Sequence, residues 1–431
     1  MSLQAGSASP LEMTTSLTNR IPVELWDEIF SFIFLLTYPS VFDFTSPFHG
    51  VYKLRRINDF DLHQWRRLSR CRTRLRLVCK KWETLILNNL RWVHRASPRA
   101  QGLTVNIPRS PIAVLDCEDC SLDVIRMIAR SKGVHIRSLH IHLENFGEPT
   151  RGLVDMAKMH MPNLVALSIH IDWESQPLLF RDISDQLPHL KALSISAGKQ
   201  TGKLGLHIFG IPPTTSLFLS LGGVSCSMPS LEILDLPSNS QEILKVPSQL
   251  RLPELRHLYG RGMDILKSRE FLNQFGHQLC SLGLYGSKEP DCRITYEEFF
   301  QQLPKMTLLV VDFRVFKLLG APPPTLGHLD TLVHLGPVYS DLFSDSLVLK
   351  FMEGDWSGSN RKFRMSDVWL PSPKSEVRTE WIKKHTLHYS RNEREVMMSW
   401  VSKFLEAGIR LEDMEGLTYA EAKRLEGEVT S

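Results

Sequence analysis

Residues 161–169 have the sequence MPNLVALSI, residues 187–195 LPHLKALSI and residues 228–236 MPSLEILDL. Apolar side chains occupy the fourth, seventh and ninth positions of each stretch. The last part of the pattern alternates with a period of two, which is typical of a short β-strand. The recurring pattern therefore predicts one short strand in each copy.

Further copies of this pattern start at Leu252 and Leu303, and weaker copies at His135, His277 and Gly327. The first apolar positions of the eight copies align at Ile136, Leu164, Leu190, Leu231, Leu255, Leu279, Met306 and Leu329. The steps between them are 28, 26, 41, 24, 24, 27 and 23 residues. All but one step lie in or near the period of leucine-rich repeats, and the 41-residue step contains a Gly- and Pro-rich insertion.

A single copy cannot bury its own apolar side chains, whereas stacked copies form one parallel sheet with a continuous core. The pattern predicts an α/β solenoid, with an irregular leucine-rich-repeat arc over residues 99–350. Two of the linkers have helical patterns, Leu122–Ala129 and Thr295–Leu303. The alternative is an ordinary α/β domain with coincidental leucines.

The remaining parts of the chain have other patterns. Residues 1–17 are small and polar and predict a disordered N-terminus. Residues 18–98 predict a basic helical domain. Residues 351–431 predict a C-terminal helical cap over the end of the solenoid, with Phe404 on its apolar face and Gly408 at the helix end.

Charge is unevenly distributed along the 431 residues, whose net charge is +4. Between Lys53 and Arg99 there are fourteen basic residues and three acids, a sum of +11, so the rest of the chain sums to −7. Such a block predicts a charged partner, either nucleic acid or an acidic protein. The structural alternative is a solvated basic helix face, because arginine stems also cover apolar surface.

The cysteines and the apolar runs bear on the compartment. Seven cysteines, an odd and scattered number, favour a reducing environment. No apolar run approaches the ~18 residues of a membrane span, and the N-terminus lacks the pattern of a signal peptide. We therefore expect a cytoplasmic or nuclear protein that has no membrane partner.

Residues 21–33 (IPVELWDEIFSFI) and 75–85 (LRLVCKKWETL) resemble the two ends of an F-box. The chain as a whole resembles F-box proteins with leucine-rich repeats, in the style of the large F-box families of mushroom-forming fungi. The positions that match the motif are Ile21, Pro22, Glu24, Leu25, Ile29, Phe30, Leu75, Val78, Cys79 and Trp82. An insertion of about twenty residues, near 37–56, separates the two halves.

The resemblance implies a function. F-box proteins dock onto the Skp-type adaptor of a cullin-based ubiquitin ligase, and the ten matching residues would form that adaptor-binding site. The repeats would hold a protein substrate, so the chain itself would need neither a catalytic residue nor a cofactor. Two alternatives stay open: an interaction scaffold without ligase association, and nucleic-acid binding through the basic block at 53–99.

Outward-facing positions between the predicted core leucines are candidates for substrate binding. We expect one such column to contain His140, Ser168, Ser194, Asp235, Tyr259, Gly283 and Val310. Tyr and Arg are often energetically important at interfaces, which selects Tyr259, Arg261 and Tyr285 as a binding patch. His140, His142 and His170 are further candidates, for which exposed polar strand residues are the alternative.

No signature of a catalytic triad, a carboxylate pair or a phosphate loop occurs in a suitable context, so we expect a protein that is not an enzyme. Cys117 and Cys120 form an isolated CxxC pair. A structural zinc site requires four ligands, and no second pair is near. We therefore expect these cysteines to be small buried apolar residues and to bind no metal.

Overall fold

The structure is a computed structural model. It describes residues 25–26, 77–78, 82, 93–96, 114–117, 120–143, 150–171, 180–197, 226–236, 247–285, 294–311, 328–334, 346–353, 361–365, 402–412 and 418. These residues belong to two compact units. The first unit takes residues up to 142 together with 156–164, and the second takes 143–155 and the residues from 165 onward. Within the described ranges, no helix has the length and apolarity that would let it span a membrane.

The first unit contains parallel strands that neighbour one another in chain order, β1 (Val93–Ala96), β2 (Val114–Cys117) and β3 (Ser138–Leu143). Helix α6 (Leu122–Lys132) leads from β2 to a 3₁₀ turn, η2 (Gly133–His135), and then to β3. Helix α7 (Thr150–His160) follows β3 and ends in the first unit.

Helix α6 forms where its sequence supplies both a cap and an apolar stripe. The Ser121 hydroxyl accepts a hydrogen bond from the Val124 amide at the N-terminus, as an N-cap residue does. Ile125 and Ile128 lie on the buried face and are fully covered. Their spacing is that of one helical face, so the predicted helix at Leu122–Ala129 is confirmed and extends to residue 132.

The second unit contains parallel strands whose spatial order is that of the chain. They are β4 (Ala166–Ile171), β5 (Ala192–Ala197), β7 (Ile233–Asp235), β9 (His257–Arg261), β10 (Ser281–Tyr285), β11 (Leu308–Val311), β12 (Thr331–His334), β13 (Lys362–Met365) and β14 (Arg410–Glu412). A separate pair, β6 (Cys226–Ser227) and β8 (Leu250–Arg251), lies at the helix side of the sheet.

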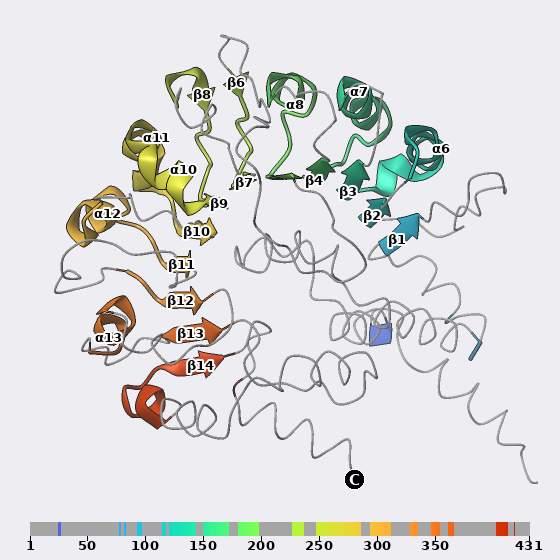
Figure 1. Cartoon of the computed structure of the whole chain (residues 1–431). Helices are drawn as coiled ribbons and strands as arrows, with labels where there is room; N and C mark the ends of the chain where they lie inside the picture. The colour runs from blue at the N-terminus through green and yellow to red at the C-terminus, as the bar shows by residue number, and fades with distance from the viewer. Residues whose placement is uncertain are drawn as a thin grey trace, which may run out of the picture. The chain divides into compact units, whose positions relative to one another are not determined.

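The helices of the second unit lie on one side of this sheet, as Figure 1 shows. They are α8 (Phe180–Gln186), α10 (Gly262–Lys267), α11 (Arg269–Phe275), α12 (Tyr296–Gln302) and α13 (Ser346–Glu353), with 3₁₀ turns η3 (Pro247–Gln249) and η4 (Gly276–Gln278). Helix α12 begins with a capping box between Thr295 and Glu298. The helix predicted at Thr295–Leu303 is thus confirmed.

The same type of turn precedes seven of the strands. The amide of the aligned apolar residue donates to the carbonyl three residues earlier, as from Leu164 to Met161 at 3.1 Å and from Leu255 to Leu252 at 3.2 Å. The proline of the sequence pattern, such as Pro162, stands at the second position of this turn. Proline is favoured there because its fixed φ suits that position.

The predicted repeat alignment is confirmed. All eight aligned residues, from Ile136 to Leu329, are at most 4% exposed. Each of the eight precedes the first residue of a strand by two positions. The described residues therefore have an α/β architecture of parallel strands, with an aliphatic core between the strands and the helices.

Two predicted regions need correction. Residues 93–96, placed in a helical domain, form strand β1 instead. Residues 351–431, predicted as a helical cap, contribute β13 and β14, and these strands continue the sheet. The predicted segments 1–17 and 37–56 lie outside the described residues.

The predicted helix end at Gly408 is confirmed. Residues 402–406 are helical, and Gly408 has a φ of 70°. The amide of Gly408 bonds to the Leu405 carbonyl, and that of Ile409 to the Phe404 carbonyl at 2.8 Å. This pair of bonds is a Schellman motif, in which glycine supplies the left-handed conformation.

Candidate binding surfaces

Tyr259, selected as a substrate-binding residue, lies inside the molecule. It is 2% exposed, and its hydroxyl lies 3.0 Å from the Ser281 hydroxyl. Burial raises the pKa of the Tyr259 phenol, and the nearby Asp235 carboxylate raises it further. The ring lies over Gly283 of the next strand, where a Cβ atom would collide with it. Tyr259 therefore fills a space between neighbouring strands.

Arg261 and Tyr285, the other members of the predicted patch, stand directly opposite each other on β9 and β10. Arg261 is half-buried and precedes α10. The side chain of Tyr285 lies outside the described residues. The binding role of this pair remains a prediction.

His140 is also buried, with an exposure of 2%. Its Nε2 lies 2.9 Å from the Ser138 hydroxyl. Desolvation lowers the pKa of His140 to about 3, so the imidazole is neutral at pH 7. The backbones of His142 and His170 lie in β3 and β4, but their side chains lie outside the described residues.

The expected open column is closed in the structure, and this expectation was wrong. Its described members are at most 7% exposed: His140, Ser168, Ser194, Asp235, Tyr259 and Val310. Two of the polar members bond to each other, and His140 and Tyr259 bond to buried serines on the strands. The Ser194 hydroxyl donates to Asp235 at 2.8 Å, and Asp235 has no exposed surface.

Ser281 joins two further buried polar side chains, those of His257 and Tyr259. Its hydroxyl lies 2.8 Å from Nδ1 of His257 and 3.0 Å from the Tyr259 hydroxyl. Burial, assisted by the charge of Arg256, lowers the pKa of His257 to about 4. Ser281 has no exposed surface, so a substrate could reach its hydroxyl only after packed side chains had moved. The network joins strands and does not present a nucleophile.

A second polar cluster occurs on β13 and β14, and the sequence analysis missed it. Glu412 is 1% exposed and accepts from Arg364 and Arg410, both at 2.7 Å. Lys362 lies at 4.0 Å from the same carboxylate. Charged residues alternate with Phe363 and Leu411, and this alternation has the period of a strand. It is the sequence signal from which the cluster could have been predicted.

Few of the predicted adaptor-binding residues are described. Leu25 and Val78 are exposed, by 48% and 54%, and Trp82 is half-buried. The rings of Trp26 and Trp82 meet edge to face, with centroids 4.6 Å apart. Ile21, Pro22, Glu24, Ile29, Phe30, Leu75 and Cys79 lie outside the described residues.

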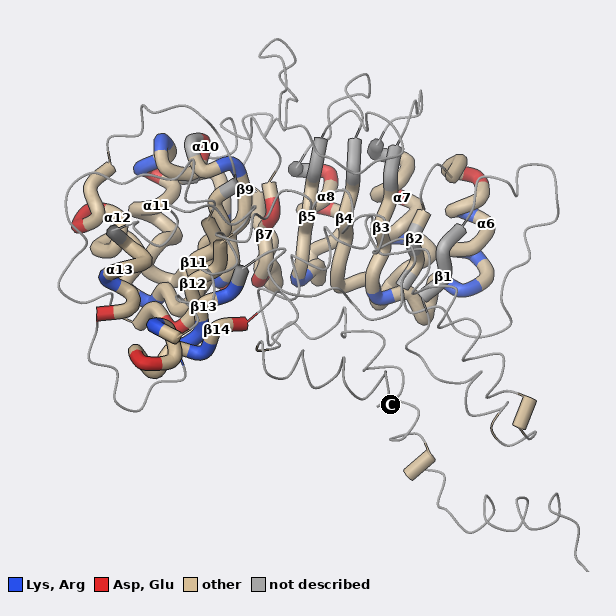
Figure 2. The backbone as a smooth tube through the Cα atoms, turned by 60° about the horizontal axis from the view of Figure 1, so that its bottom comes forward, with Lys and Arg blue, Asp and Glu red and all other residues tan. Residues whose placement is uncertain are grey.

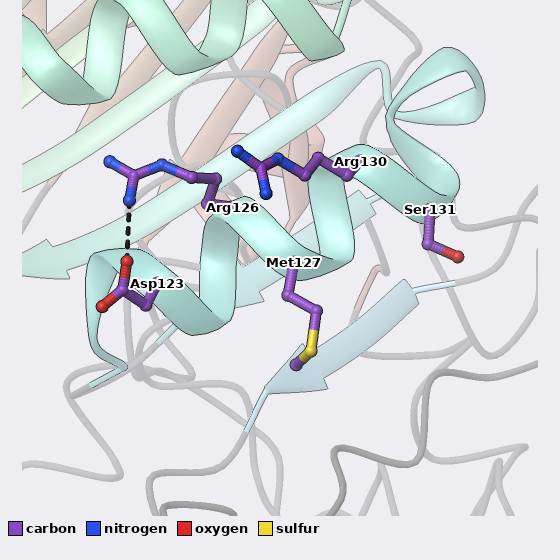
Figure 3. Close-up of a pocket in the computed structure, with 5 residues that line it drawn as sticks. All are labelled: Asp123, Arg126, Met127, Arg130 and Ser131. Carbon is purple, nitrogen blue, oxygen red and sulfur yellow. Dashed lines mark hydrogen bonds and ion pairs between the residues drawn. The ribbon is translucent and has the colours of Figure 1, made fainter.

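A pocket lies along the outer face of α6 in the first unit. It is lined by Asp123, Arg126, Met127, Arg130 and Ser131. Figure 3 shows Arg126 and Arg130 on the same side of the helix, with Arg126 paired to Asp123 at 2.7 Å. Asp123 is largely exposed, so this ion pair is weak. Met127, which lines the same pocket, is 39% exposed.

Cys117 and Cys120 are free thiols, each 1% exposed. The expectation that both are buried is confirmed. In the part of the chain that the structure describes, no group of three His, Cys, Asp or Glu side chains is arranged to hold a metal ion.

Comparison with known proteins identified no relative of the chain. No protein-family model matches the chain, and no curated protein matches its sequence.

Proposed function

We propose that the chain is the substrate-recognition subunit of a Skp–cullin–F-box ubiquitin ligase. The observation that carries the proposal is the contact between Trp26 and Trp82. These residues belong to the two halves of the F-box-like motif and are 56 positions apart. A contact between them supports a motif that folds as one module despite the insertion between its halves. Such an aromatic pair contributes about 0.5–1.5 kcal/mol beyond its buried area.

Exposed apolar side chains in the two halves of the motif support an adaptor-docking role. Leu25, Leu77 and Val78 are exposed by 48%, 80% and 54%. Large apolar side chains that stay exposed in both halves of the motif favour a protein-binding surface. Complementary charge between the basic block at 53–99 and an acidic adaptor would speed association and orient it.

The parallel strands support the second half of the proposal. Repeated strand–helix units that stack into a leucine-rich-repeat solenoid form an extended face on which a protein substrate can be held. The ligase mechanism then depends on proximity, because the bound substrate is kept near a ubiquitin-charged enzyme supplied by the complex. This role requires no catalytic residue in the chain and places it in the cytosol or nucleus.

Co-purification of the full-length chain with a Skp-type adaptor tests the proposal. Leu25→Asp and Val78→Asp each place a charge on one half of the motif, at an exposed position that should not disturb folding. Leu405→Asp is the matched control, since Leu405 is 66% exposed in the second unit. We expect the wild type and the control to retain the adaptor, and each motif variant to lose at least tenfold in affinity.

Circular dichroism of each variant shows whether it remains folded. A wild-type chain that does not retain the adaptor, or motif variants that bind as tightly as the control does, would disprove the proposed function. In that case the scaffold or nucleic-acid alternative would replace it.

A further inference from the structure

The ends of α6 and α7 meet in the first unit and form one continuous surface. Gly133, at the end of α6, approaches the His160 carbonyl so closely that a Cβ atom would not fit. The Asn163 side chain donates to the Val134 carbonyl at 2.8 Å. We call this region the helix-end surface. Its members are Arg130, Lys132, Val134, Arg137, Lys158 and Met159.

The helix-end surface is strongly basic. Its six residues include four cations and no acid, and Arg130, Arg137 and Lys158 are exposed. The acidic residue of α6, Asp123, lies in the first turn, at the opposite end of the helix. Figure 2 shows red at that end of α6 and blue in its middle and at its other end. Helix C-termini favour cations, but Arg137 belongs to neither helix.

Two apolar side chains lie exposed within this basic region. Val134 is 57% exposed and Met159 is 68% exposed. Of the eight large apolar residues that are exposed in the described part of the chain, six belong to the first unit, although the second unit supplies most of the described residues. The helix dipoles explain the cations in the last turns of α6 and α7, but they give no reason to leave aliphatic side chains in water.

We infer that the helix-end surface binds an acidic segment of a partner protein in which carboxylates alternate with apolar residues. The carboxylates pair with Arg130, Arg137 and Lys158, and an apolar side chain covers Val134 and Met159. The α6 pocket, which shares Arg130, extends the surface by a further arginine and by Met127 (Figure 3). This surface shares no residue with the F-box-like motif, so the inference does not rest on adaptor binding.

The charge pattern favours this partner over nucleic acid. A phosphate backbone is held by cations and its affinity depends steeply on salt, but it gains little from two aliphatic side chains. An acidic segment with apolar residues uses both features, because removing the aliphatic surface from water contributes roughly 25 cal/mol per Å².

Fluorescence anisotropy with the full-length chain tests the inference through three labelled probes of equal length. The first is a peptide of sixteen residues in which leucine recurs every third or fourth position among glutamates. The second is polyglutamate, and the third is a single-stranded oligonucleotide. At physiological salt we expect the leucine-containing peptide to bind at least tenfold more tightly than polyglutamate.

Variants assign this binding to the helix-end surface. Val134→Ser with Met159→Ser should remove the tenfold preference for the leucine-containing peptide, and Arg130→Glu with Lys158→Glu should weaken both peptides at least tenfold. The matched controls in the second unit are Leu405→Ser and Arg269→Glu, both at exposed positions, and they should change neither affinity.

Two results would overturn the inference. In one, both peptides bind equally and the serine variants change nothing, which would indicate unspecific attraction. In the other, the oligonucleotide binds most tightly and only the charge variants weaken it, which would assign the surface to nucleic acid. Neither result depends on the adaptor experiment.

Discussion

A side chain at position 283 would collide with the ring of Tyr259, so only glycine fits there. The Tyr259 ring crosses from β9 to β10 and lies over Gly283, and its hydroxyl is held at Ser281. The ring is 2% exposed, so it has no open space into which it can move. At this position the glycine is required by packing between strands and not by its backbone conformation.

Gly283→Ala should therefore destabilise the second unit. A methyl group forced into a packed site costs about 1–3 kcal/mol, and urea unfolding followed by circular dichroism would measure the loss. In a Tyr259→Val background the same substitution should cost much less, because the ring is absent. An equal loss in both backgrounds would contradict the steric explanation.

His140 should make the first unit sensitive to acid. Burial lowers its pKa from 6.5 to about 3 in the folded chain, whereas the unfolded chain regains a pKa of about 6.5. The unfolded state therefore binds one more proton between these values. The stabilisation is complete above pH 6.5 and is lost as the pH falls, by up to about 1.4 kcal/mol per pH unit.

The measurement compares urea midpoints of the wild type and His140→Gln at pH 7.5 and pH 5. Glutamine can still reach the Ser138 hydroxyl but does not titrate, so the variant should lose less stability between the two pH values. His257, whose pKa is lowered to about 4, also reduces stability as the pH falls, and it does so in both proteins. Identical pH dependence would show that His140 is not the group responsible.

At the scale of elements, glycine also sets how neighbouring repeats pack. Gly133 and Gly276 each stand three residues before an aligned apolar residue, Ile136 and Leu279. Each faces the last carbonyl of the following helix, that of His160 or Gln302. Both glycines have ordinary right-handed helical φ values of −58°. Their role is close approach between successive helices.

Gly276→Ala should destabilise the chain, although the same change in a free helix is usually stabilising. A helical Gly→Ala change normally contributes about 0.4–1 kcal/mol of stability. Here the Cβ atom meets a backbone carbonyl that cannot rotate away, so we expect a loss of about 1–3 kcal/mol in urea unfolding. Asn273→Ala, at an exposed position of α11, is the control and should be neutral or stabilising. A gain at both positions would refute the packing role.

At the scale of the whole molecule, the sheet of the second unit extends further along the chain than the leucine pattern does. Strands β13 and β14 carry the charged residues Arg364 and Glu412 in register with Val333 of β12. They are joined through the buried Glu412 and its partners Arg364 and Arg410. On the helix side, Phe363 stacks on Phe404 at 4.9 Å. Their pairing depends on contacts between residues about 48 positions apart, which no local pattern records.

Much of the fold could be predicted from the sequence, but little of the candidate site could. The turn, strand and core positions from Ile136 to Leu329 followed from local rules, since proline, a fixed apolar spacing and period-two alternation act within one copy. The exposure of the polar strand residues could not be predicted from these local rules. Tyr259 and His140 are predicted to face outward because they stand between the core leucines, yet each is buried and has a buried hydrogen-bonding partner.

The sequence by itself determined the repeat register, the helix ends at Thr295 and Gly408 and the aliphatic core, because these depend on neighbours within a few residues. Only the tertiary structure decided which polar side chains are closed off from solvent and which surfaces remain open. The buried Ser194–Asp235 bond and the helix-end surface arise from side chains of successive copies. Their burial and charge depend on how the copies stack, which is a property of many residues together.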